Sequence, residues 1–157
     1  MEIPTRLLQL LNEHQISYEV LHHPAAYTAQ ELAALEHIKA RHYAKVVMVQ
    51  TAETPLMAVL PADHHIDLSK LETVSGTHSP TLAREVEFQA LFPDCAVGTM
   101  PPFGNLYGIP TYVDRSLTQD DYIVFEAGTH TEAVRMRYPD YERLAHPQIA
   151  EFTFKVA

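Results

Sequence analysis

Two apolar runs in quick succession constrain the fold of this chain more than any other feature of its sequence. Residues 45–50, KVVMVQ, form its strongest β-branched run, and residues 55–60, PLMAVL, follow after a link of four residues. Two such runs joined by a short polar link are typical of a β-hairpin. Strands this close in sequence pair antiparallel, which argues against the regular strand–helix–strand period of a doubly wound sheet.

The remainder of the chain mixes short helices and short strands, with no repeat and no linker. Apolar periodicity predicts helices at residues 4–14, 28–38, 67–74, 85–92 and 140–145. In the second of these, Thr28 and Glu31 match a capping box. Further strands are predicted at residues 17–21, 111–114, 122–125, 132–137 and 151–156. We therefore expect an α+β fold with a mixed, mostly antiparallel, partly closed β-sheet flanked by short helices.

Length and charge limit the function classes that the chain can serve. At 157 residues it fits one domain, residues 1–157, and its formal charge is −9, from 20 acidic and 11 basic residues. A protein that holds long stretches of nucleic acid usually presents a basic face, whereas here no run of three basic residues occurs. We expect no DNA binding, and contact with no more than the end of an RNA strand.

The chain also lacks the signals of membrane insertion and secretion. No apolar run approaches the ~18 residues of a membrane span, and the first residues do not resemble a signal peptide. The single cysteine, Cys95, excludes an internal disulfide framework and a multi-thiolate zinc site. We therefore expect a cytoplasmic protein that does not contact a membrane.

The cysteine and the histidines give no clear catalytic or metal motif. Cys95 follows Asp94, whose charge would raise the pKa of the thiol, so we interpret Cys95 as a buried bystander rather than a nucleophile. The histidine pairs His22-His23 and His64-His65 attract attention, but adjacent residues on a strand point to opposite faces. We expect no metal site and no cofactor.

Three other segments are candidates for a site, each with a plainer alternative. Lys45 opens the uncharged run and could aim its ammonium group into a cleft, or it could extend to water at the strand end. The stretch GTMPPFGN, residues 98–105, combines glycine freedom with proline rigidity; it could present backbone amides to a substrate or form a surface turn. Residues 128–130, Gly-Thr-His, could line a site or form a hairpin turn.

Four motifs follow one another along the chain: Ala44-Lys45 ahead of the apolar run, Gly98-x-x-x-Pro102-Phe-Gly, Val113-Asp114, and Ala127-Gly-x-His130. Their order and spacing resemble those of the YbaK and prolyl-tRNA-synthetase-associated editing domains, which remove wrongly attached amino acids from tRNA. The resemblance runs from about residue 22 to residue 144. It implies one α+β domain with a surface pocket.

The resemblance also implies a set of site residues. Catalytic roles fall to Lys45, Gly98 and His130. Substrate contacts fall to Thr99, Met100, Pro101, Pro102, Phe103 and Gly128. The double proline leaves open whether Pro101 or Pro102 is the loop proline that matters. In such enzymes the loop amides would stabilise the charge that develops during ester hydrolysis, and the substrate 2′-hydroxyl would help to position water, without a metal.

The implied function is hydrolysis, in trans, of the ester in mischarged aminoacyl-tRNA. The implied partner is the acceptor end of the tRNA, with an aminoacyl-tRNA synthetase as a candidate second partner. Editing has to reject the larger, correct residue, so a small amino acid such as alanine, serine, cysteine or threonine is expected. The alternatives are a non-catalytic module that binds an aminoacyl or nucleotide-like ligand, and a protein that docks on a synthetase.

Overall fold

The computed structural model describes residues 2–25, 33–34 and 38–156. Its helices are α1 (Thr5–Glu13), α3 (Leu68–Ser75), α4 (Glu85–Phe88) and α5 (Tyr138–Ala145), with 3-10 turns η1 (Ala40–His42), η2 (Gln89–Leu91), η3 (Gly104–Tyr107) and η4 (Arg115–Gln119). Its strands are β1 (Tyr18–His22), β2 (Ala44–Gln50), β3 (Leu56–Pro61), β4 (His64–Ile66), β5 (Thr81–Leu82), β6 (Thr111–Asp114), β7 (Tyr122–Glu126), β8 (Glu132–Arg137), β9 (Gln148–Ala150) and β10 (Thr153–Lys155).

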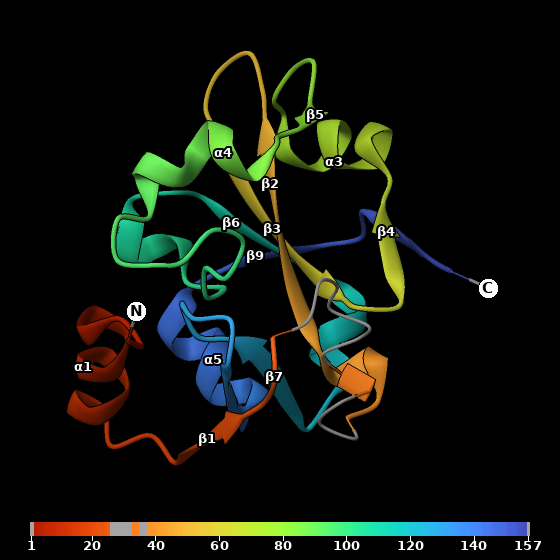
Figure 1. Ribbon diagram of the computed structural model, residues 1–157. Helices are drawn as coiled ribbons and strands as arrows, with labels where there is room; N and C mark the ends of the chain where they lie inside the picture. The colour runs from red at the N-terminus through yellow and green to blue at the C-terminus, as the bar shows by residue number, and fades with distance from the viewer. Residues whose placement is uncertain (1, 26–32, 35–37, 157) are drawn as a thin grey trace.

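The predicted hairpin is the centre of the molecule. Strands β2 and β3 pair antiparallel, with Ala44 opposite Pro61 and Val49 opposite Leu56. Strand β6 then adds to β3 in parallel, and the sheet order is β5-β2-β3-β6-β9. In Figure 1, β2, β3, β6 and β9 cross the middle of the view, with β5, α3 and α4 near the top and α1, α5, β1 and β7 below. The long strands therefore form a frame that carries the connecting loops.

Two smaller sheets complete the arrangement. Strands β1, β8 and β7 form an antiparallel sheet, and β10 pairs antiparallel with β4. A single parallel bridge between Tyr43 and Val124 joins the start of β2 to β7. The fold class is confirmed: pairing is mixed and mostly antiparallel, the helices are short, and the described strands do not close into a barrel.

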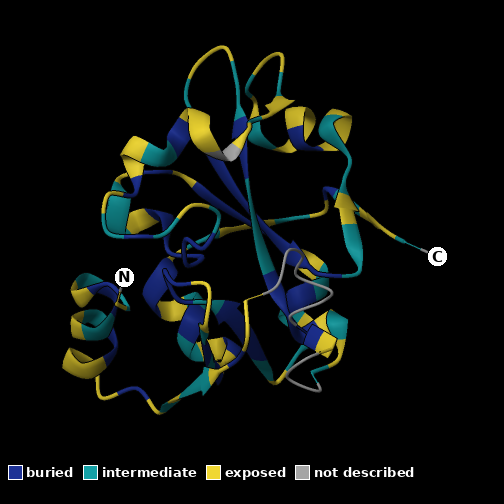
Figure 2. Cartoon of the chain, in the orientation of Figure 1, coloured by how far each residue is buried: buried dark blue, intermediate teal, exposed yellow. Residues whose placement is uncertain are grey.

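The core lies between the central sheet and the β1-β8-β7 sheet. The buried cluster takes Leu7 and Leu11 from α1, Val59 from β3, and Phe125 from β7. These side chains are fully buried. In Figure 2 most residues of the crossing strands are buried, and exposed residues lie in the outer loops. Burial of the apolar stripe of α1 is what holds this helix to the sheets.

Most predicted elements are present, and the differences concern short segments. The helix expected at residues 85–92 is divided into α4 and η2, and the strands β4, β5 and β9, each of three residues or fewer, were not predicted. Such strands have too little sequence pattern to be recognised and exist through their pairing with neighbours. The capping box of Thr28 and Glu31 lies outside the described residues, as does most of the helix expected there.

Candidate functional site

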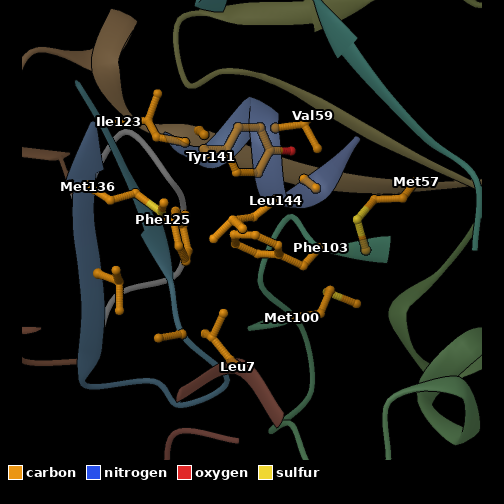
Figure 3. Packing of buried hydrophobic residues seen from close by; sticks show 14 of the residues in the cluster. Leu7, Met57, Val59, Met100, Phe103, Ile123, Phe125, Met136, Tyr141 and Leu144 are labelled. Carbon is orange, nitrogen blue, oxygen red and sulfur yellow. The ribbon is translucent and has the colours of Figure 1, made fainter. Parts of the chain in front are cut away.

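The glycine–proline stretch is a loop whose side chains face the core. Thr99 and Met100 are buried, as are both prolines, and Phe103 is fully buried. The ring of Phe103 makes edge contacts with Phe125 and Tyr141, at centroid distances of 5.7 and 5.1 Å. Figure 3 shows it among Met100, Phe125 and Leu144. These side chains anchor the loop, so what the loop can offer to a ligand is its backbone.

A hydrogen bond from helix α5 fixes the middle of this loop. The hydroxyl of Tyr141 donates to the carbonyl oxygen of Pro102 over 2.7 Å, and the N–H of Phe103 donates to the carbonyl oxygen of Pro101 over 2.8 Å. Tyr141 is fully buried, and burial raises the pKa of its hydroxyl well above the ordinary value. It therefore remains a neutral donor. Both prolines are held, each through its own carbonyl group.

Tyr141→Phe tests this anchor. The variant keeps the ring contacts of Tyr141 but leaves the Pro102 carbonyl without its buried donor, so we expect a loss of about 1–3 kcal/mol in the free energy of unfolding. Chemical denaturation measures it. The matched control is Tyr18→Phe, because the hydroxyl of Tyr18 donates to the exposed side chain of Asn12. Equal stability of Tyr141→Phe and the wild type would contradict the anchoring role.

The loop is tied directly to the second predicted site segment. The N–H of Gly128 donates to the carbonyl oxygen of Thr99 over 2.8 Å, and the N–H of Ala96 donates to the carbonyl oxygen of Gly128 over 2.9 Å. Gly98 and Gly128 both have positive φ, +77° and +87°. That conformation strains residues with a Cβ atom, so both positions favour glycine for backbone reasons. The structure thus brings together two of the three predicted segments.

Gly128 and His130 have different surroundings: the first is packed and the second is exposed. A Cβ atom added to Gly128 would lie 2.5 Å from Cδ of Pro4, the residue that precedes α1. The family resemblance assigned Gly128 to substrate contact. Because it has no side chain, Gly128 also lets Pro4, at the start of the N-terminal helix, pack against the turn. His130, two residues on, is exposed. Its side chain lies at the surface beside the turn, and its assignment to the site stays a prediction.

A polar network joins α1 to the segments on either side of the glycine–proline loop. The Nε of Arg6 donates to Asp94 over 2.7 Å, the hydroxyl of Tyr107 donates to the other oxygen of Asp94 over 2.9 Å, and Arg6 also lies over the Tyr107 ring. Cys95 is buried beside Tyr107, and burial raises the pKa of its thiol. The burial expected of Cys95 is confirmed, and its lack of a role in the chemistry stays a prediction.

Lys45, the third predicted segment, lies at the start of β2 and is about half buried. Burial lowers the pKa of its ammonium group, while the negative charge of Asp63 opposes that effect. Tyr43 and Val124 form a parallel bridge, and two residues further along each strand stand Lys45 on β2 and Glu126 on β7. Glu126 ends β7, just before the turn of Gly128. Lys45 thus lies toward that turn, although no hydrogen bond or ion pair joins it to the loop within the described ranges.

Three residues near the site escaped sequence reasoning. The negative charge of Asp63 opposes the effect of burial on the pKa of Lys45, the hydroxyl of Tyr141 holds the carbonyl of Pro102, and Pro4 packs on Gly128. The predicted hairpin brings the end of β3, and so the segment of Asp63, next to Lys45, but no local pattern marks the aspartate itself as part of a site. The other two contacts join helices to loops that are distant in the sequence, and no periodicity predicts them.

Residues of the types that bind metals are dispersed. Across residues 2–25, 33–34 and 38–156, no group of three or more histidine, cysteine, aspartate or glutamate side chains could hold an ion. The ring of His64 bonds Asp63 over 2.8 Å, whereas that of His65 is exposed and contacts Phe154. The two neighbours therefore point in different directions, as alternation along a strand requires.

Comparison with known proteins adds a family relationship. The sequence model of the aminoacyl-tRNA editing domain matches residues 23–144. The multifunctional Ser/Thr-tRNA deacylase ProXp-y of Escherichia coli is 27% identical over 152 residues, covering 94% of this chain and 90% of the relative. A proposed Cys-tRNA(Pro)/Cys-tRNA(Cys) deacylase, EbsC of Enterococcus faecalis, is 24% identical over 157 residues, covering 96% and 94%.

A solved structure shows the same fold. The crystal structure of a proposed trans-editing enzyme for prolyl-tRNA synthetase superposes with a TM-score of 0.80, at 21% identity, and the match covers 95% of each chain. The agreement extends beyond residues 23–144 to the elements at both ends of the chain, so the frame that holds the loop and Lys45 is shared.

Proposed function

Because the chain belongs to the aminoacyl-tRNA editing domain family, we propose that it is a hydrolase that deacylates mischarged aminoacyl-tRNA in trans. The relatives named above as Ser/Thr-tRNA and Cys-tRNA deacylases support this proposal, since their alignments span nearly the whole of each chain. The whole chain, residues 1–157, serves as one editing domain in this proposal. Arg6 of α1 supports it, because its ion pair with Asp94 joins the first helix to the loop segment.

The observation that carries the proposal is that two backbone N–H groups of the loop have no acceptor within the described residues. Among the described residues, no acceptor bonds the N–H groups of Gly98 and Met100, while Thr99 between them donates to Ala96 over 3.1 Å. Fixed N–H donors of this kind stabilise an oxyanion without reorganising during the reaction. We assign to the loop from Gly98 to Pro102 the role of holding the ester carbonyl and the terminal ribose.

Thr99, Met100 and Phe103 contribute to this site by positioning the loop, since their side chains are buried. Gly128 supports it from the neighbouring turn through its two backbone hydrogen bonds. His130, exposed beside that turn, is proposed to orient the bound amino acid. The substrate 2′-hydroxyl is proposed to position the attacking water, and no metal or cofactor takes part.

Lys45 is proposed to contact the terminal nucleotide or the acyl group. Its half-buried position lowers its pKa, yet Asp63 favours the charged form, so the ammonium group suits electrostatic contact better than proton abstraction. Its neighbours on β2 support the assignment, because Ala44 and Met48 are buried and hold the strand in place.

Lys45→Ala tests the proposed function. We expect deacylation to fall by about tenfold or more, which is about 1.4 kcal/mol of transition-state stabilisation, with little change in Tm. Lys45→Met is the matched second variant, because it keeps the aliphatic stem and removes the charge. Initial rates on a panel of tRNAs mischarged with alanine, serine, cysteine and threonine measure the effect and identify the amino acid. Full activity in both variants would remove Lys45 from the site.

Turnover separates an enzyme from a binding module. At substoichiometric concentration the proposed enzyme clears the ester, whereas a non-catalytic module would protect it. The acceptor end of tRNA is the proposed partner, with docking on an aminoacyl-tRNA synthetase as a second proposal. Since aminoacyl-tRNA is used in translation, we propose the cytoplasm as the site of action. None of the helices described here is long and apolar enough to cross a bilayer.

A further inference from the structure

A basic hollow opens where β4, α3, η4 and the C-terminal strand approach one another. Its volume is about 360 Å³, and its lining includes Lys70, Arg115 and Lys155. These are three of the 11 lysines and arginines in a chain with a formal charge of −9. Thr153 and His64 also line it. On the right of Figure 1, β4 lies close to the C-terminal segment that supplies the lysine and the threonine.

Two carboxylates, Asp114 and Glu151, line the hollow beside its three cations and leave a formal surplus of one positive charge, histidine not counted. Asp114 is buried, and its carboxylate accepts hydrogen bonds from Ser116 and from the N–H of Phe152, the latter at 3.1 Å. Glu151 lies 3.9 Å from Arg115. Within the part of the chain that the structure describes, Lys70 and Lys155 make no ion pair. Two cations therefore face solvent in this hollow with no internal partner.

The hollow lies near Lys45 along the central sheet, with the buried Leu60 between them. Lys45 pairs with Leu60, and Leu60 follows Val59, which pairs with Val113, the residue before Asp114. Lys45 and Asp114 therefore lie on one face of the sheet two strands apart, which is about 10 Å at ordinary strand spacing. Asp63 links the two places as well: it influences the charge of Lys45 and bonds Nδ1 of His64.

We propose that this hollow binds a backbone phosphate of the RNA strand whose terminal ribose ester reaches Lys45. The inference rests on the proposed deacylase function and adds to it a surface that holds the nucleic acid. Lysine ammonium groups and a hydroxyl are common partners of phosphate oxygens, and such contacts fix the position of a strand without reading its sequence. The hollow thereby allows an acidic protein to hold the end of a tRNA.

The test compares the binding of uncharged tRNA at several salt concentrations. The double variant Lys70→Gln/Lys155→Gln should bind about three- to tenfold more weakly at low salt, and the slope of log K against log salt should fall by about 0.7 for each phosphate that the variant no longer neutralises. The control is Arg84→Gln/Arg143→Gln, which removes the same charge from exposed residues paired within their own helical segments. We expect the control to keep the wild-type slope.

Each result decides the proposal. Equal affinities and slopes for the hollow variant and the wild type would overturn it, as would an equal loss in the control variant, or a wild type that binds no tRNA. Binding of inorganic phosphate that is abolished in the hollow variant, without any change in tRNA affinity, would assign the hollow to a free anion and also overturn it. Thermal unfolding of both double variants checks that each is folded.

A minimal substrate separates this proposal from the proposed function. An amino acid esterified to adenosine carries no phosphate, so the hollow variant should cleave it at the wild-type rate while showing a raised KM for aminoacyl-tRNA. Slower cleavage of the minimal ester would place the hollow in the catalytic machinery and contradict the inference. If the wild type cleaves neither substrate, the deacylase function fails, while the tRNA binding measurements still decide whether the hollow holds RNA.

Discussion

Gly98→Ala is expected to slow deacylation by about a hundredfold per folded molecule, the lower end of the loss that follows removal of one preorganised oxyanion donor. Gly98 has φ of +77°, so a Cβ atom strains the backbone at the point where the N–H groups of Gly98 and Met100 have to face the ester. The strain itself should cost about 1 kcal/mol of stability, a small part of the 5–15 kcal/mol typical of a domain. Single-turnover rates measure the effect, with thermal unfolding to count folded protein.

Gly76→Ala is the matched control for this experiment. Gly76 has φ of +70° at the end of α3, and no atom lies within 4 Å of the position that its Cβ would take. It therefore imposes the same kind of backbone strain away from the loop. Pro102→Ala should act more mildly than Gly98→Ala, by loosening the loop. If Gly98→Ala retained the specific activity of the control, the loop would be a surface turn without a role in the reaction.

Gly128→Ala is expected to destabilise the protein by about 3 kcal/mol, through backbone strain and overpacking together. Gly128 has φ of +87°, and its added Cβ would lie 2.5 and 2.8 Å from Cδ and Cγ of Pro4. At this chain length the loss should lower Tm by roughly 10 °C. Activity should fall as well, because displacement of Gly128 disturbs its hydrogen bonds to Ala96 and Thr99. Chemical denaturation and calorimetry measure the change.

Pro4→Ala identifies the cause, because it removes both atoms that the new Cβ would meet. Pro4→Ala/Gly128→Ala should recover the stability that overpacking removes and keep the loss of about 1 kcal/mol due to positive φ. The double-mutant cycle should therefore show a favourable coupling. A cycle without coupling would mean that the packing of Pro4 against the turn does not account for the requirement for glycine.

Several parts of the fold follow from local sequence. The apolar run of β2 and the run of β3 predict the hairpin, because two adjacent segments with such patterns find each other at low entropic cost. The helix predicted at residues 67–74 is present as α3, with Asp67 as its N-cap, whose side chain accepts from the N–H of Lys70. The order of the motifs identified the family, and with it the loop of Gly98 and the position of Lys45, although their roles in catalysis stay predictions.

The tertiary structure decided what the residues of these motifs do. Sequence patterns established that the chain has the central hairpin, the short flanking helices and a glycine–proline loop. They did not establish that Met100 and Phe103 face the core, that Tyr141 holds Pro102 across 39 residues, or that Arg6 holds Asp94 across 88. The reason is physical: periodicity and turn preference act over a few neighbouring residues, whereas burial and close approach depend on which distant segments the sheets bring together.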